Sequence, residues 1–187
     1  QALNDVNKAL NINPKSVKNL KRKYELLVIL GNFPEAEQVM QKCCAFEPKE
    51  YTHINDLGRA KTLTTQFNSF YDAYHSENYV KAEELGKELI NACPGNTDFK
   101  VAYLDSLVSN NKLTEGHTFY TTKLSETERA QDEAIFIMCK SFYYEGNYEK
   151  ALQAIADRII KSTVFRICCG PLLLSHERSR LLQPHGH

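Results

Sequence analysis

The chain has 187 residues, of which 42% are hydrophobic, and this is enough to bury the core of one or two domains. Lysine and arginine together number 23, as do aspartate and glutamate, so the formal net charge is zero. Nucleic acids and anionic membrane surfaces attract proteins with a basic surplus, so we expect neither as a partner. A net charge of zero excludes a basic surplus of the whole chain, but it does not exclude a local charged patch.

No segment of the sequence is suited to a membrane or to secretion. The longest apolar runs, such as residues 26–30, are far too short to cross a bilayer, so no membrane insertion is expected. The chain opens with the polar residues Gln-Ala-Leu-Asn-Asp-Val-Asn-Lys and without methionine. These opening residues do not resemble a signal peptide, and we interpret the chain as a piece of a longer protein.

The cysteine pattern argues against a metal site and against disulfides. No Cys-x-x-Cys spacing occurs, and the six histidines do not cluster beside the thiols, so the ligands of a zinc site are not supplied. We therefore expect no metal, no cofactor, and free buried thiols in a reducing cytoplasm. The six cysteines are Cys43, Cys44, Cys93, Cys139, Cys168 and Cys169.

A short motif recurs along the chain, in which a polar turn precedes an aromatic residue or leucine and then a small residue. It occurs at 31–36, 77–82, 111–116 and 146–151, and the third copy is the weakest. Its small residue recurs after 46, 34 and 35 residues, at Ala36, Ala82, Gly116 and Ala151. The prolines Pro14, Pro48 and Pro94 repeat the 34- and 46-residue spacings. These spacings indicate a repeat period of 34 residues, with one insertion of twelve residues.

Each part of the motif has a physical reason in a helix-turn-helix unit. Glycine or asparagine ends the first helix, the small residue allows close approach of the second, and proline stops the second helix. A 34-residue period of this kind resembles the tetratricopeptide repeat (TPR). The sequence thus predicts an all-α fold, a TPR helix-turn-helix superhelix or α-solenoid. An ordinary helical bundle with coincidental spacing is the alternative.

The repeats predict the following order of parts. Residues 1–50 form the end of a first TPR unit, with helix B of one repeat at 1–13 and a full repeat at 17–50. Residues 51–62 form a helical joint within one long helix at about 49–75. Residues 63–162 form a second unit of three repeats, at 63–96, 97–130 and 132–162. The tail at 163–187 lacks the pattern and is either a capping helix, at about 172–183, or disordered.

The resemblance implies that positions 2, 5, 6 and 9 of each first helix face a concave groove. In the repeat at 17–50 these positions are Lys18, Lys21, Arg22 and Glu25, and Lys18 and Arg22 lie four residues apart on one helical face. Two adjacent cations suit a carboxylate. The later repeats place aromatic and apolar residues there, with some acidic ones, and such a groove suits an apolar or extended peptide. Alternatively, the aromatic residues simply fill space between helices. The candidates are Phe67, Asn68, Tyr71, Phe136 and Lys140.

Lys18 and Arg22 match one half of the carboxylate clamp of TPR co-chaperones. That clamp holds the C-terminal Glu-Glu-Val-Asp tail of the seventy- and ninety-kilodalton heat-shock chaperones, and its other residues would lie before Gln1. The resemblance implies a partial peptide-binding site. The alternative is that both residues are solvated helix charges.

The order of parts over residues 1–162 resembles the TPR region of DnaJ-type co-chaperones of subfamily C member seven. This resemblance implies a cytoplasmic co-chaperone that binds heat-shock chaperones and passes on client proteins. The chain has no His-Pro-Asp loop, which the J domain of such proteins needs. A TPR scaffold or adaptor in a ciliary or trafficking assembly is the second hypothesis.

An enzyme is not expected. No Gly-rich phosphate loop, His-Glu-x-x-His or Gly-x-Ser-x-Gly motif occurs in the sequence. Cys93 and His117 are conceivable as a nucleophile and its base, but each lies in an ordinary helical context.

Overall fold

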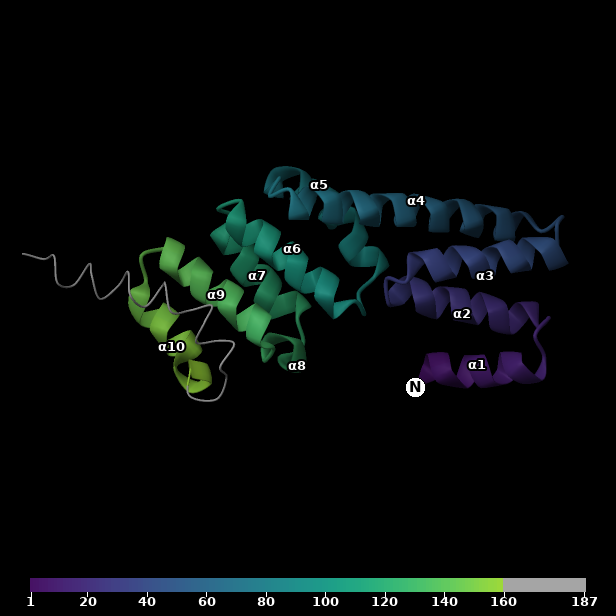
Figure 1. The fold of residues 1–187 in the computed structure, drawn as a ribbon, viewed down its shortest axis with the longest axis horizontal. Helices are drawn as coiled ribbons and strands as arrows, with labels where there is room; N and C mark the ends of the chain where they lie inside the picture. The colour runs from purple at the N-terminus through teal and green to yellow at the C-terminus, as the bar shows by residue number, and fades with distance from the viewer. Residues whose placement is uncertain (160–187) are drawn as a thin grey trace, which may run out of the picture. The chain divides into compact units, whose positions relative to one another are not determined.

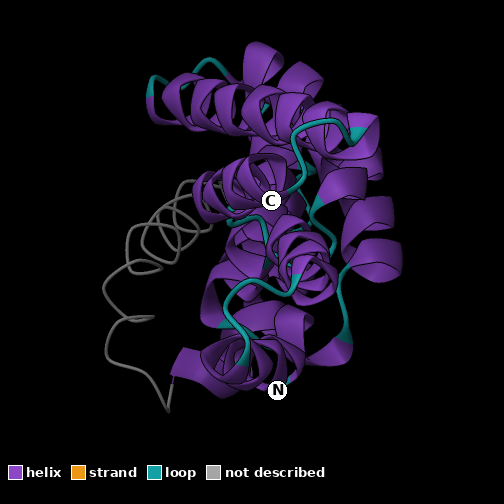
Figure 2. Ribbon diagram, turned by 90° about the vertical axis from the view of Figure 1, so that its right-hand side faces the viewer, coloured by secondary structure: helices purple, strands orange, loops and turns teal. Residues whose placement is uncertain are grey.

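The structure, a computed structural model, describes residues 1–159, and all regular structure in that range is helical (Figures 1 and 2). The prediction of an all-α chain is confirmed. The predicted tail at 163–187, and the last residues of the final repeat, lie outside the described residues. The helices are α1 (Ala2–Ile12), α2 (Val17–Ile29), α3 (Phe33–Phe46), α4 (Tyr51–His75), α5 (Tyr79–Ala92), α6 (Thr97–Ser109), α7 (Leu113–Lys123), α8 (Glu126–Arg129), α9 (Asp132–Tyr144) and α10 (Tyr148–Ile159).

The helices follow the predicted repeats. Helices α2 and α3 occupy the repeat at 17–50, and the second half of α4 with α5 occupies 63–96. Helices α6 and α7 fall in 97–130, and α9 and α10 fall in 132–162. Within the described chain, α2 packs on α3, α4 on α5, and α9 on α10, so each of these pairs is a hairpin of helices.

The described residues divide into two compact units, residues 1–103 (unit 1) and the described residues from 104 onward (unit 2), with their boundary inside α6. We describe each unit by itself. The division at the 51–62 segment that the repeat pattern predicts stays a prediction about repeat organisation.

The recurring motif forms the turn between the two helices of each repeat. One residue per turn takes a left-handed conformation, with φ between 58° and 75°, at Gly31, Glu77, Asn111 and Gly146. At the first turn, the amides of Gly31 and Asn32 donate to the carbonyls of Val28 and Leu27, which satisfies carbonyls at the end of α2. The next asparagine caps the second helix in three of the four turns, at Asn32, Asn78 and Asn147.

Helix α4 is one continuous helix of 25 residues, so the long helix predicted at 49–75 is confirmed. Gly58 and several threonines, whose hydroxyls bond back to carbonyls four residues earlier, make it a poor isolated helix. Contacts with α2 stabilise the first half of α4. The Tyr24 hydroxyl donates to the Asp56 carbonyl at 3.3 Å, and the Lys21 ammonium lies 3.9 Å from the Asp56 carboxylate. Residues 51–62 therefore belong to the packing of unit 1.

A cluster of aromatic rings forms the centre of unit 1. Phe70 and Phe99 are fully buried, with ring centroids 4.8 Å apart. The Phe67 ring lies 5.2 Å from that of Phe33 and 5.6 Å from that of Phe99, so it joins α3, α4 and α6. We call Phe33, Phe67, Phe70 and Phe99 the ring cluster.

A group of buried side chains joins the last two described helices of unit 2. Cys139, Ala151 and Ile155 are buried together between α9 and α10, with Ile135, Phe136 and Phe142 packed against them. At the start of α7, Gly116 brings its backbone close to Val108, where an added Cβ would lie 3.2 Å from a Val108 methyl. This close approach is the physical reason for a small residue at that position of the motif.

In the part of the chain that the structure describes, no helix combines the length and the apolar character that a bilayer crossing requires.

Gly86 of α5 provides a stability test for the close contact between helices in unit 1. An added Cβ would overlap the buried Tyr103 ring and lie 3.3 Å from Phe70, so we expect Gly86→Ala to lower the free energy of unfolding by about 1–3 kcal/mol. The matched control is Gly58→Ala in α4, where no atom lies within 4 Å of the added Cβ. We expect this control to gain about 0.5–1 kcal/mol from helix propensity. Urea unfolding followed by circular dichroism measures both, and equal effects would contradict the close packing.

Candidate functional site

Helix α2 carries the two basic residues that the repeat pattern singles out. Ser16 caps the helix by accepting a hydrogen bond from the Asn19 amide, which fixes where its first turn begins. Lys18 and Arg22 are exposed and stand one turn apart, and neither has an ion-pair partner among residues 1–159. The structure thus leaves two adjacent cations on α2 available to an external anion.

Lys21 has a different environment from its two neighbours. It is half-buried, and its ammonium lies 3.9 Å from the Asp56 carboxylate of α4. A partly exposed pair at this distance contributes little energy, but it gives Lys21 an anionic neighbour that Lys18 and Arg22 lack. Of the three basic candidates on α2, only Lys18 and Arg22 lack a partner within the described chain.

Phe67 and Tyr71 mainly serve the packing of unit 1. Phe67 belongs to the ring cluster, and the Tyr71 ring lies 4.9 Å from it. Burial, with a smaller effect of Asp98, raises the pKa of Tyr71 to about 12, as expected for a side chain packed inside the unit. Asn68, between them, is exposed. These positions support the alternative that the aromatic residues fill space between helices.

Phe136 and Lys140 are also engaged within unit 2. Phe136 packs against the buried group of Cys139, Ala151 and Ile155. The Lys140 ammonium lies 3.0 Å from the Asp105 carboxylate and donates to the Ser109 hydroxyl at 2.7 Å. Lys140 therefore links α9 to α6 and is a weak candidate for holding a ligand.

One polar cluster in unit 2 resembles catalytic machinery in composition but not in geometry. The Nε2 atom of His117 lies 2.9 Å from the Ser141 hydroxyl and 3.4 Å from the Glu145 carboxylate. In a catalytic triad the serine and the acid use opposite nitrogens of the histidine, whereas here both approach the same one. Ser141 is fully buried, so its hydroxyl has no access to a substrate. The cluster holds α7 against α9.

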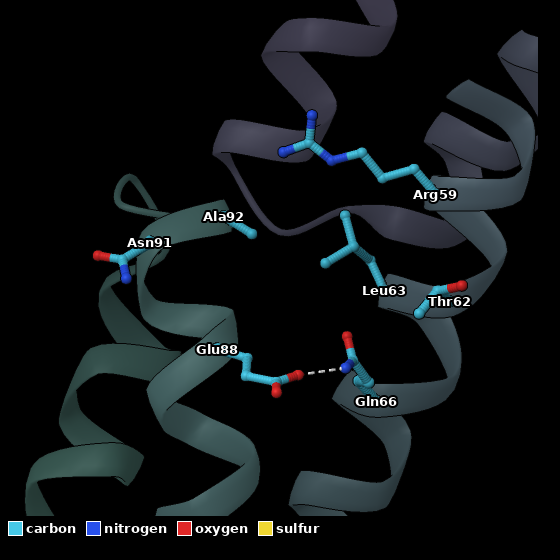
Figure 3. A pocket seen from close by; sticks show the side chains of 7 residues that line it. All are labelled: Arg59, Thr62, Leu63, Gln66, Glu88, Asn91 and Ala92. Carbon is cyan, nitrogen blue, oxygen red and sulfur yellow. Dashed lines mark hydrogen bonds between the residues drawn. The ribbon is translucent and has the colours of Figure 1, made fainter. Parts of the chain in front are cut away.

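A hollow of about 480 Å³ lies between α4 and α5 in unit 1, and sequence reasoning missed it (Figure 3). The Gln66 amide donates to the Glu88 carboxylate at 2.6 Å across one end of it. The only sequence signal for it is the twelve-residue insertion, which extends α4 past the end of α5. Its lining residues are Arg59, Thr62, Leu63, Gln66, Glu88, Asn91 and Ala92.

The thiols of the described chain are free cysteines and mostly buried. Burial raises the pKa of Cys43 and of Cys93 to about 11 and also raises the pKa of Cys139. Cys44 is half-buried. Within residues 1–159, no group of three or more histidine, cysteine or acidic side chains is placed to hold a metal ion.

Phe67→Ala separates packing from binding at the predicted groove. Since the ring touches Phe33, Tyr71 and Phe99, we expect its removal to lower the free energy of unfolding by about 2 kcal/mol, less than for a fully buried phenylalanine. Asn68→Ala, one residue along on the exposed surface, should change it by less than about 0.5 kcal/mol. Chemical denaturation measures both changes. A Phe67→Ala protein as stable as wild type would show that the ring does not support the fold.

Thiol reactivity tests the burial of the cysteines. A pKa of about 11 leaves roughly 100-fold less thiolate at pH 8 than the unperturbed value of 9.0 does, and burial blocks access as well. In a Cys168→Ser/Cys169→Ser background, we expect a disulfide reagent at pH 8 to modify Cys44 first, and Cys43, Cys93 and Cys139 only after unfolding. Mass spectrometry of time points identifies the modified residue. Rapid modification of Cys93 in the folded protein would contradict its placement.

Comparison with known proteins identifies the fold. No family model matches this sequence, and no curated protein does. Among solved structures, the chain is similar to the crystal structure of the P58(IPK) TPR domain, with a TM-score of 0.72 and 15% sequence identity. The match covers 97% of this chain and 51% of the other, so this chain spans about half the length of its structural neighbour. The predicted TPR helix-turn-helix fold is confirmed, while the relation to DnaJ-type co-chaperones of subfamily C member seven stays a prediction.

Proposed function

We propose that this chain is a protein-binding TPR module of a co-chaperone, in which α2 binds the C-terminal carboxylate of a heat-shock chaperone. The observation that carries the proposal is the pair Lys18 and Arg22. Both are exposed, one turn apart, and without an ion-pair partner among residues 1–159. Two such cations on the first helix of a repeat are suited to a single carboxylate group.

The electrostatics of α2 favour an acidic peptide. Lys23 pairs with Glu35 at 2.7 Å, and Lys21 pairs with Asp56, so the fold uses two of the helix's cations internally. The two that remain belong to one face, where each can donate a charge-assisted hydrogen bond to a carboxylate oxygen. Such bonds contribute about 1.5–3 kcal/mol each when well formed, and less at an exposed site.

The proposed function requires binding alone and no reaction. The partners would be heat-shock chaperones of the seventy- and ninety-kilodalton classes, and the module would help to pass client proteins between them. The buried, free thiols of Cys43, Cys93 and Cys139 favour a reducing compartment such as the cytoplasm.

A scaffold or adaptor in a larger assembly is the second candidate function. One observation favours it: Phe46 at the end of α3, and Tyr51 and Ile54 in the first turn of α4, are large apolar residues that remain exposed. Exposed apolar groups of this kind are typical of protein interfaces. A scaffold would use this surface and would not require a free terminal carboxylate.

Peptide titration tests the proposal and separates the two functions. We expect a fluorescent peptide ending in Glu-Glu-Val-Asp to bind the full chain, and Lys18→Ala or Arg22→Ala to weaken binding by roughly 3–10-fold each, as expected for loss of about 1 kcal/mol. Amidation of the peptide's C-terminus should weaken it similarly.

Lys42→Ala is the matched control, because Lys42 is an exposed lysine on α3, the second helix of the same repeat. It should bind like wild type. Equal affinity of the Lys18→Ala, Arg22→Ala and wild-type proteins, or indifference to amidation, would overturn the carboxylate site and leave the scaffold hypothesis.

A further inference from the structure

The hollow between α4 and α5 exists because the two helices differ in length. Helix α4 has 25 residues and α5 has 14, and the Gln66–Glu88 hydrogen bond joins them side by side. Helix α5 ends at Ala92, while α4 continues toward its N-terminus through Leu63, Thr62 and Arg59. One wall of the hollow belongs to α4, where Arg59 and Thr62 come from the additional turns and Leu63 and Gln66 from the repeat that follows. The end of α5, from Glu88 to Ala92, forms the other wall (Figure 3).

The hollow has opposite charges at its two ends and an apolar middle. Figure 3 shows Arg59 and Glu88 at opposite ends, with Leu63 and Ala92 between them. Leu63 is buried, and Ala92 is half-buried. A ligand that lies along the hollow would therefore meet a cation, then an apolar surface, then a carboxylate.

Among the residues that line the hollow, Arg59 offers a ligand the largest number of hydrogen-bond donors. It is exposed and has no ion-pair partner among residues 1–159. A guanidinium has five donors in a planar fork that fits a carboxylate with two parallel hydrogen bonds.

We propose that this hollow binds an extended peptide segment with an acidic side chain on Arg59, an apolar side chain on Leu63 and Ala92, and a basic side chain toward Glu88. In an extended chain, alternate side chains point to the same face, so the acidic, apolar and basic residues occupy positions i, i+2 and i+4. Such a segment spans about 13 Å. This site goes beyond the α2 carboxylate site, since it needs neither Lys18 nor a free C-terminus.

The openness of the hollow favours a peptide over a small molecule. Small ligands are held where 70–90% of their surface is buried. Here Arg59, Thr62, Glu88 and Asn91 are all exposed, so a small molecule would stay largely in water. A peptide can continue past both ends, and the Asn91 amide can donate to and accept from its backbone.

The test uses the blocked peptide acetyl-Glu-Ser-Val-Ser-Lys-amide and its reversed sequence. Two control peptides accompany them: the glutamine partner, in which glutamine replaces Glu, and the serine partner, in which serine replaces Val. Amidation removes the terminal carboxylate, so this experiment is independent of the α2 site. Titration into the full ¹⁵N-labelled chain, followed by NMR, should shift the amide signals of α4 around 59–66 and of α5 around 88–92. We expect one of the two sequence directions to bind at least fivefold more tightly than the glutamine and serine partners.

Arg59→Gln should lose at least fivefold in affinity for the acidic peptide and none for the glutamine partner. The matched control is Arg22→Gln, an exposed arginine on α2 that should bind these amidated peptides like wild type. Circular dichroism establishes that both variants are folded. The proposal is overturned by equal affinity of Arg59→Gln and wild type, by no shifts at millimolar peptide, or by equal shifts from free glutamate and valine, which would indicate a small-molecule pocket.

Discussion

Helix α4 packs against both α3 and α5, and the structure of unit 1 depends on this double contact. Phe70 is completely buried at its centre, and Phe67 on the same helix reaches Phe33 and Phe99. The ring cluster thereby joins helices that are far apart in the sequence. Rings offset or edge-on at these separations attract one another beyond their hydrophobic burial.

The additional turns of α4 then determine which polar side chains near them form hydrogen bonds or ion pairs within the unit and which stay available to a partner. Asp56 binds Tyr24 through its carbonyl and Lys21 through its carboxylate. Within the described chain, Asp56 forms no ion pair with Lys18 or Arg22, and Arg59, one turn after Asp56, has no acidic partner. Both proposed sites, the carboxylate site on α2 and the hollow beside α5, thus follow from where the lengthened helix places one aspartate and one arginine.

Charged residues join helices in both units, as the pairs Lys23–Glu35 and Lys140–Asp105 show. In unit 2, Lys140 is bound by Asp105 and Ser109, and His117 lies between Ser141 and Glu145. These polar groups stabilise contacts between helices and are less available to a partner. Unit 2 also keeps exposed lysines, at Lys123 and Lys150, but the proposed binding residues Lys18, Arg22 and Arg59 all belong to residues 1–103.

The sequence by itself determined the repeat period, the helix pairs and the continuous helix α4, because these depend on local properties. Gly31, Asn32 and their counterparts set the left-handed turn and the cap, and the spacing of prolines and small residues places each helix. Only the tertiary structure decided the state of each candidate side chain. Lys18, Lys21 and Arg22 look equivalent along α2, and Phe67 looks like a groove residue. Their availability depends on neighbours 30 or more residues away, such as Asp56 and Phe99, and no local pattern encodes those contacts.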